Sequence, residues 1–190
     1  MVTQTDRLIL REMTEADLPA LAEILQDAET MTAYEGPFSD REVGQWLERQ
    51  RDRYARDGFG LWSAELRTTG VMIGQCGPSW QDIDGDDVLE VGYLFNRAYW
   101  HRGYAIEAAR ACRDYAFARL EIDRVYSQIR DSNIASMNVA IRNGMTIRSR
   151  FVKRYRGMDM THYAFAIDRS QWVAIAGRPQ QAASLIAGPA

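Results

Sequence analysis

Apolar residues in the first third of the chain recur at steps of three and four, which is the period of an amphipathic helix. The stripe Leu18–Leu25 predicts a first helix, and residues 14–17 before it have the composition of a capping box, in which side chains satisfy free backbone amides. A second capping box at residues 39–42 starts another apolar stripe that reaches Tyr54. With the apolar run Leu8–Arg11 ahead of both, the pattern predicts a strand followed by two helices.

From residue 59 the pattern changes to alternation and short apolar runs, and helical steps return after Gly103. The predicted elements are three strands of a meander (59–66, 71–76 and 88–95), a long helix (103–120), a strand (125–129), a short helix (135–142) and two late strands (149–155 and 163–167). We expect one domain, and the Gly-, Pro-, Gln- and Ala-rich stretch from Gly177 is expected to be a loosely attached end.

Composition supports a folded, metal-free domain. The chain has 190 residues, of which 46% are hydrophobic, enough to bury a core without disulfide bonds or a structural metal ion. Cys76 and Cys112 lack Cys-x-x-Cys spacing, and two histidines do not supply the usual zinc ligands. The N-terminus has no apolar signal core, and no run approaches the roughly 18 apolar residues that a membrane span needs. We therefore expect a cytoplasmic protein with no metal and no membrane contact.

The overall charge is slightly acidic. A net charge of −3 gives no electrostatic footprint for nucleic acid, which usually requires a basic domain or stripe. This charge balance suits a cationic acceptor better. The expected assembly is a monomer or a homodimer.

The first candidate for chemistry is the segment 91–105, which joins a predicted strand to the long helix through a loop that contains Gly103. Such a turn leaves free backbone amides at the positive end of the helix dipole, which is a site for phosphate. His101 and Arg102 add side-chain donors. The loop has neither the glycine pattern of a P-loop nor that of a Rossmann turn, and turn geometry alone also explains one glycine.

A family resemblance sharpens this expectation. Residues 100–108, Trp-His-Arg-Gly-Tyr-Ala-Ile-Glu-Ala, resemble the acetyl-CoA pyrophosphate loop Q/R-x-x-G-x-G/A of GNAT acetyltransferases, with Gly103 and Ala105 matching. The motif has Trp100 at its first position in place of Gln or Arg, and in this it resembles the branch of ribosomal-protein N-terminal (alanine/serine) acetyltransferases. The segments 90–93, 133–136 and 143–145 also resemble that branch. With the opening segment 5–11 and the ending Gln171-Trp172, the resemblance covers residues 5–172 as one domain and leaves residues 173–190 as a C-terminal tail.

The resemblance implies an α+β (α/β) GNAT fold, with a central, mixed, mostly antiparallel sheet and helices on both faces. The sheet is expected to splay open after the strand 88–95, where the pantetheine arm of acetyl-CoA would enter as a false strand. A bulge near residues 93–95 would free the necessary amides and carbonyls. A plain buried strand also fits the composition of these residues.

The resemblance also implies which residues bind the cosubstrate acetyl-CoA. They are Tyr93, Leu94, Phe95, Trp100, His101, Arg102, Gly103, Tyr104, Ala105, Ile106, Asn133 and Asn138. Asn133 also fits a purely structural role as the N-cap of the short helix. A solvent-facing position is the alternative for Asn138 and for Ser136.

For catalysis, the resemblance implies direct attack of an amine on the thioester. Glu90 is the candidate base, acting directly or through water, although a solvent-facing Glu also fits a strand. Many relatives use a Tyr acid four residues before the glycine that ends the short helix, but this chain has Ala140 there. Ser136 or water is the expected substitute, and a backbone amide near Tyr93 or Leu94 is the expected oxyanion donor.

The acceptor is expected to be an amine-bearing small molecule or a protein N-terminus. An α-amine with a pKa of about 8 is neutral in roughly a tenth of molecules at pH 7, far more often than a lysine with a pKa of about 10.4. An α-amine therefore needs less base. The acceptor pocket is expected from residues 30–60 and from loops after Gly77 and at 154–162.

Two alternatives remain open at the sequence level. One is a catalytically silent module of the same fold that binds CoA and regulates, because neither acid nor base is secure. The other is a dimerisation or interaction domain in which Trp46, Trp62, Trp80 and Trp100 form exposed patches. Core positions are the more common place for such aromatics.

Overall fold

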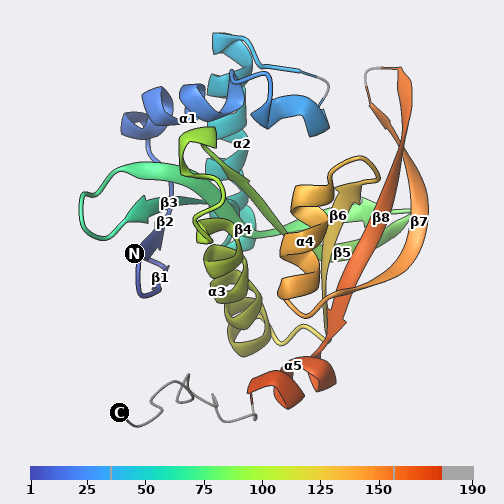
Figure 1. The fold of residues 1–190 in the computed structure, drawn as a ribbon. Coiled ribbons are helices and arrows are strands. Elements are labelled where there is room, and N and C mark those ends of the chain that lie inside the picture. Colours follow the sequence, from blue (N-terminus) through green and yellow to red (C-terminus); the bar gives the residue numbers. More distant parts are fainter. Residues whose placement is uncertain (35, 156, 177–190) are drawn as a thin grey trace, which may run out of the picture.

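A computed structural model describes residues 1–34, 36–155 and 157–176, and its ribbon is shown in Figure 1. One sheet has the strand order β1-β2-β3-β4-β5-β6-β8-β7. The strands are β1 (Thr3–Gln4), β2 (Leu8–Arg11), β3 (Trp62–Leu66), β4 (Met72–Ile83), β5 (Asp86–Phe95), β6 (Arg124–Arg130), β7 (Thr146–Tyr155) and β8 (Met158–Asp168). The helices are α1 (Leu18–Leu25), α2 (Asp40–Asp57), α3 (Tyr104–Arg119), α4 (Ile134–Arg142) and α5 (Arg169–Ala176), with short 3-10 helices at Glu15–Asp17, Thr30–Tyr34 and Arg97–Tyr99.

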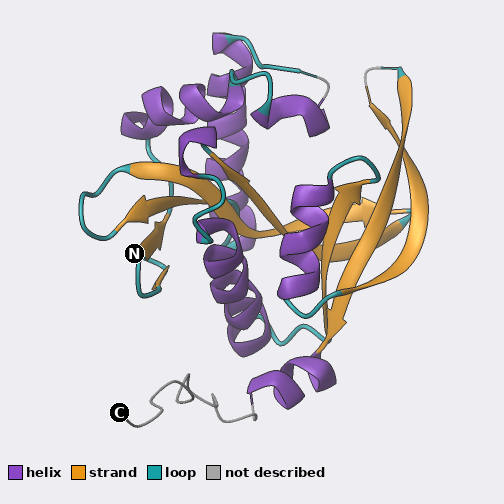
Figure 2. Cartoon of the chain, in the orientation of Figure 1, coloured by secondary structure: helices purple, strands orange, loops and turns teal. Residues whose placement is uncertain are grey.

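The sheet is mixed and mostly antiparallel, as predicted. Strands β5 and β6 pair in parallel, and the other neighbouring strands pair antiparallel. Helices cover both faces, because α3 and α4 pack into one apolar cluster while α1 and α2 pack into another. Figure 2 shows α3 and α4 in front of the sheet, with α2 behind it. This arrangement confirms the expected α+β architecture.

Local signals fix the helix α2. The backbone amide of Ser39 donates to Glu42 Oε2 at 2.8 Å, and the amide of Glu42 donates to Ser39 Oγ at 3.4 Å. Both bonds are those of the predicted capping box. The helix ends at Gly58, whose φ of 77° is the left-handed conformation that glycine adopts without strain.

The first predicted helix differs in detail. The amide of Thr14 donates to Asp17 Oδ2 at 2.7 Å, so the capping box is present, but it begins a 3-10 turn at Glu15–Asp17. The α-helix starts only at Leu18, with Pro19 in its first turn. Proline has no backbone N–H, so a regular helix cannot run back across this position.

Several strands are longer than predicted. Strand β4 continues to Ile83 and pairs with β5 down to Asp86, whereas the sequence predicted a strand that ends at residue 76. Asp84 and Gly85 both have positive φ, 53° and 94°, as a tight hairpin turn requires. Cross-strand pairing therefore keeps the polar residues of this hairpin extended. Strand β8 is likewise longer than residues 163–167, and the predicted strand at 149–155 lies within β7.

The C-terminal part of the described chain is a helix that the sequence reasoning missed. Trp172 stacks on Phe117 of α3 with ring centroids 5.2 Å apart, and its indole N–H donates to Asp114 Oδ1 at 2.7 Å. Helix α5 reaches Ala176, beyond the predicted domain end at residue 172. The rest of the predicted tail, residues 177–190, lies outside the described residues.

The tryptophans do not form an exposed patch. Trp62 is fully buried, Trp46 and Trp100 are partly buried, and Trp80 is exposed. In the described part of the chain, no helix is long and apolar enough to cross a membrane.

Candidate active site

The sheet opens between β5 and β6. Their backbone pairing is limited to Glu90 and Tyr126, next to which Ser127 Oγ donates to the carbonyl of Val91 at 2.8 Å. Towards Phe95, no β6 residue pairs with β5 in the register of the described strands. This is the expected splay, and it leaves the edge of β5 available for hydrogen bonding.

The prediction of a bulge near residues 93–95 is wrong. Strand β5 pairs with β4 without a register shift from Phe95, opposite Gly74, to Asp86, opposite Ile83. The free edge of β5 therefore comes from the divergence of β6 and needs no extra residue in β5.

Alternation along β5 sends its side chains to opposite sides of the opening. Val91, Tyr93 and Phe95 pack towards the cluster that contains α3 and α4. Leu94 packs towards α1 and α2, and Glu90 lies four residues before it, on the same side of the strand. A group bound in the opening thus meets Glu90 on one face of the sheet and α4 on the other.

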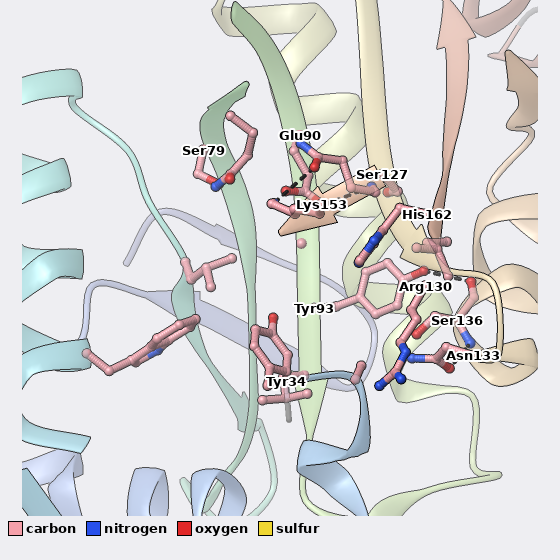
Figure 3. A pocket seen from close by; sticks show the side chains of 18 of the residues that line it. Tyr34, Ser79, Glu90, Tyr93, Ser127, Arg130, Asn133, Ser136, Lys153 and His162 are labelled. Carbon is pink, nitrogen blue, oxygen red and sulfur yellow. Dashed lines mark hydrogen bonds between the residues drawn. The ribbon is translucent and has the colours of Figure 1, made fainter. Parts of the chain in front are cut away.

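A cavity of about 570 Å³ lies at this opening (Figure 3). Its walls come from α2, the 3-10 helix Thr30–Tyr34, strands β4 to β8 and the start of α4. The residues of its lining that matter below are Arg49, Arg53, Glu90, Tyr93, Leu94, Gln128, Arg130, Asn133, Ser136, Lys153 and His162. A volume of this size is typical of small-ligand sites.

Glu90 is a half-buried carboxylate in this cavity. Its Oε1 accepts a 2.9 Å hydrogen bond from the backbone amide of Gln128. Burial raises its pKa above the usual range of Glu, while the Gln128 amide and the charges of Lys153 and Arg53 oppose that shift. A carboxylate with a raised pKa is better matched to accepting a proton near neutral pH.

Ser136 and Asn133 lie at the start of α4. Asn133 Oδ1 accepts from the amide of Ser136 at 3.0 Å, which is the N-cap role anticipated from the sequence. Tyr93 Oη donates to the carbonyl of Ser136 at 2.8 Å, and burial raises the pKa of this phenol. Figure 3 shows Tyr93 reaching across towards Ser136.

Two other positions on α4 point elsewhere. Ala140, which replaces the Tyr acid of many relatives, is fully buried in the core. Asn138 is exposed and does not line the cavity. Contact of Asn138 with the cosubstrate therefore stays a prediction.

The predicted pyrophosphate loop precedes α3. Gly103 has a φ of 79° and is the N-cap of α3, so the first amides of that helix follow it directly. Trp100 Nε1 donates to the carbonyl of Phe95 at 2.8 Å, which folds the loop back onto the end of β5. His101 and Arg102 are exposed, and Tyr104, Ala105 and Ile106 form the first turn.

An ion pair that the sequence reasoning missed fixes this loop. Arg7 Nε donates to Glu107 Oε2 at 2.6 Å, and Arg7 Nη1 donates to the carbonyl of Arg102 at 2.9 Å. The opening segment of the chain thereby holds the first turn of α3. Both residues lie in segments that carry the family resemblance, but the pattern alone gave no reason to connect them.

Strand β8 contributes His162 to the cavity lining, from the segment 154–162 in which the sequence predicts part of the acceptor pocket. His162 Nδ1 lies 3.0 Å from the carbonyl of Met160, which leaves Nε2 as the other ring nitrogen for a ligand. Burial lowers the pKa of His162 and favours the neutral ring. Among the described residues, no group of His, Cys, Asp and Glu side chains suits a metal ion.

Comparison with known proteins decides the family. The model of the acetyltransferase (GNAT) domain matches residues 7–146. The chain belongs to the GNAT acetyltransferases. Membership of this family supports an acetyltransferase enzyme, and enzymes of the family use acetyl-CoA as the donor.

The chain is also similar to individual proteins and solved structures. The Bacillus subtilis protein YkkB is 39% identical over 142 residues, which are 74% of this chain and 83% of that protein. The structure of an acetyltransferase from Agrobacterium tumefaciens is 28% identical, with a TM-score of 0.73 over 87% of this chain and 92% of that one. The ribosomal L7/L12 alpha-N-protein acetyltransferase shares the fold, with a TM-score of 0.73 at 19% identity over 88% of this chain and 93% of that one.

Proposed function

We propose that this GNAT enzyme transfers the acetyl group of acetyl-CoA directly to a primary amine, on a small molecule or a protein N-terminus. The observation that carries the proposal is the opening of the sheet between β5 and β6, with Glu90 in the cavity and Ser136 at the start of α4. A thioester bound along the free edge of β5 would lie between these two groups.

The chemistry needs three groups. Glu90, directly or through water, takes a proton from the amine as its nitrogen bonds to the acetyl carbon. A backbone amide near Tyr93 or Leu94 stabilises the oxyanion that forms on the acetyl oxygen. The carbon–sulfur bond then breaks, and the leaving thiolate is protonated by Ser136 or by water. Position 140 of α4 holds a buried alanine, which has no hydroxyl, so the acid cannot come from that position.

We propose that the loop of residues 100–106 binds the pyrophosphate of acetyl-CoA. The first turn of α3 offers backbone amides and the positive end of the helix dipole. The ion pair between Arg7 and Glu107 supports the role, because it holds that turn in place before any ligand arrives. The loop would then bind the pyrophosphate of acetyl-CoA, and the cavity would hold the acetyl thioester at the other end of the same molecule.

Among acceptors, an α-amine is favoured over a lysine side chain. Glu90 is the one candidate base in the described lining of the cavity, and an α-amine with a pKa of about 8 needs less help to become neutral. Release of free thiol from acetyl-CoA, measured with a panel of α-amines, tests the proposal. Turnover should rise with pH through an apparent pKa of about 8, and exclusive modification of lysine side chains would contradict the preference.

A silent CoA-binding module remains the second candidate, for one specific reason. The helix position that supplies the acid in many relatives holds Ala140 here. The thiol-release measurement separates the two candidates, because such a module binds CoA without releasing thiol in the presence of any amine.

A further inference from the structure

Cationic side chains from α2, β6 and β7 line the cavity, although the whole chain has a net charge of −3. Among the described residues, the charged side chains of the cavity lining are Arg49, Arg53, Arg130 and Lys153 against Glu42 and Glu90. Glu42 is engaged at the N-terminus of α2, where it accepts from the amide of Ser39. The cavity therefore carries an excess of cationic side chains around a single central carboxylate, Glu90.

Arg53 is a half-buried guanidinium on α2. Its Nη1 donates to Gln50 Oε1 at 3.1 Å, and no carboxylate of the described residues lies within ion-pair distance. A guanidinium offers five donors in a planar fork that matches carboxylate and phosphate. A partly desolvated cation without an anionic partner costs free energy, which a bound anion would offset.

Lys153 approaches the same cavity from β7. It is the only lysine in a chain with 23 lysine and arginine residues, and its Nζ donates to Gln128 Oε1 at 3.1 Å. The other side-chain atom of this amide, Gln128 Nε2, is buried and has no hydrogen-bond partner among the described residues. The cavity thus contains a buried donor next to Lys153 that lacks an acceptor.

Both cations lie near the candidate base. The positive charges of Lys153 and Arg53 act on Glu90, whose backbone-bonded Oε1 is fixed by Gln128. Figure 3 shows Lys153 beside Glu90 and Ser127. These cations would repel a polyamine, and they would favour the neutral, reactive form of an amine held beside them.

We infer that the acceptor is a small-molecule primary amine that also carries an oxyanion, a carboxylate or a phosphate, which Arg53, Lys153 and Gln128 bind. The inference rests on the proposed function and names the substrate class of the same site. It reverses the expectation from overall charge, because the local charge of the cavity is opposite in sign to that of the chain. The cavity volume of about 570 Å³ suits an acceptor of this size.

Matched acceptor pairs test the inference by steady-state thiol release. One pair compares aspartic acid α-amide with asparagine α-amide, the other compares O-phosphoserine α-amide with serine α-amide, and spermidine serves as the polycation. The value of kcat/KM should be at least about tenfold higher for the anionic member of a pair, and the two pairs distinguish carboxylate from phosphate. Equal values within both pairs, or a preference for spermidine, would overturn the inference while leaving the proposed function intact.

Substitutions locate the effect. Arg53→Met and Lys153→Met should raise KM for the anionic member and reduce the preference to about one, while KM for the neutral member changes little. Arg53→Lys and Lys153→Arg should retain part of the preference. Arg41→Met removes an exposed cation on α2 outside the cavity lining and should change nothing. A loss of turnover that is equal for both members of a pair would show a structural role instead.

A second readout does not depend on turnover. Calorimetry measures the affinity of each of the four α-amides for the CoA-saturated protein. Aspartic acid α-amide and O-phosphoserine α-amide should bind at least about tenfold more tightly than their neutral partners. If no amine is acetylated, the proposed function fails. Equal affinity for all four compounds would overturn the inference on its own.

Discussion

Tyr93 Oη donates a 2.8 Å hydrogen bond to the backbone carbonyl of Ser136, which joins β5 to the start of α4 across the opening of the sheet. Strand β5 and strand β6 share backbone pairing only at Glu90 and Tyr126, so this bond adds to the few hydrogen bonds that Ser127 and Gln128 make across the opening. It positions α4 where the leaving thiolate is expected.

Loss of this link should loosen α4. Tyr93→Phe removes the donor and leaves the carbonyl of Ser136 to find water, so the free energy of unfolding should fall by about 1 kcal/mol. Urea unfolding measures it. Tyr99→Phe is the control, since no hydrogen bond of the Tyr99 hydroxyl appears among the described residues. Equal stability of Tyr93→Phe and the wild type would show that the bond contributes nothing.

The account predicts that Gly103→Val abolishes binding of CoA. Gly103 has a φ of 79° directly before α3, where a β-branched side chain strains the backbone of the proposed pyrophosphate loop, and its Cβ would lie 3.4 Å from Arg7 Nη2, which holds that loop. Calorimetry with CoA measures the effect. Gly70→Val is a matched control, because Gly70 has a similar φ of 70° and open space around it. Unchanged CoA affinity in folded Gly103→Val would remove the loop from the binding site.

Glu90→Gln should lower turnover by about 100-fold with little change in CoA affinity, because a neutral amide accepts no proton. Ser136→Ala should show the same pattern if its hydroxyl protonates the thiolate. Glu48→Gln, at an exposed position on the same helix as Arg53, controls for the loss of a carboxylate. Wild-type rates in both site variants would mean that positioning alone supplies the catalysis.

Glu90 should also cost stability at neutral pH. Burial raises its pKa in the folded state, so its contribution to stability is greatest below the ordinary Glu pKa of about 4.3 and is lost as pH rises through the raised value. Glu90→Gln should therefore melt at a higher temperature than the wild type at pH 8, and the difference should shrink as the pH falls towards 4. Thermal unfolding across this range measures both proteins. A lower melting temperature for Glu90→Gln at pH 8 would contradict the sign.

Local chemistry made much of the fold predictable. The capping box at Ser39 and the apolar steps of α3 act within a few residues, so the sequence pattern indicates them directly. The ends of β4 and β5 were not predictable in this way, because residues 79–83 are held extended by pairing with the opposite strand. Pro19 in the sequence already indicates that the first α-helix starts close to this residue, although the apolar pattern alone does not show it.

The candidate site divides along the same line. Gly103, Asn133 and Glu90 each lie in a short segment that carries the family resemblance, and the structure shows the first two as N-caps of α3 and α4 and Glu90 in the cavity lining. Their roles toward acetyl-CoA and the amine stay predictions. Arg53 and Lys153 are 100 positions apart in the numbering and meet only in the folded cavity. No sequence motif links residues so far apart, so the positive charge of the cavity lining is seen only in the folded structure.

The most direct test of the central claim is mass spectrometry of α-amines after incubation with acetyl-CoA and the full chain. The account predicts an acetylated amine in an amount equal to the free thiol released, and neither product with Gly103→Val. Binding of CoA by the wild-type protein without any acetylated amine or released thiol would contradict acetyl transfer and would leave a silent CoA-binding module.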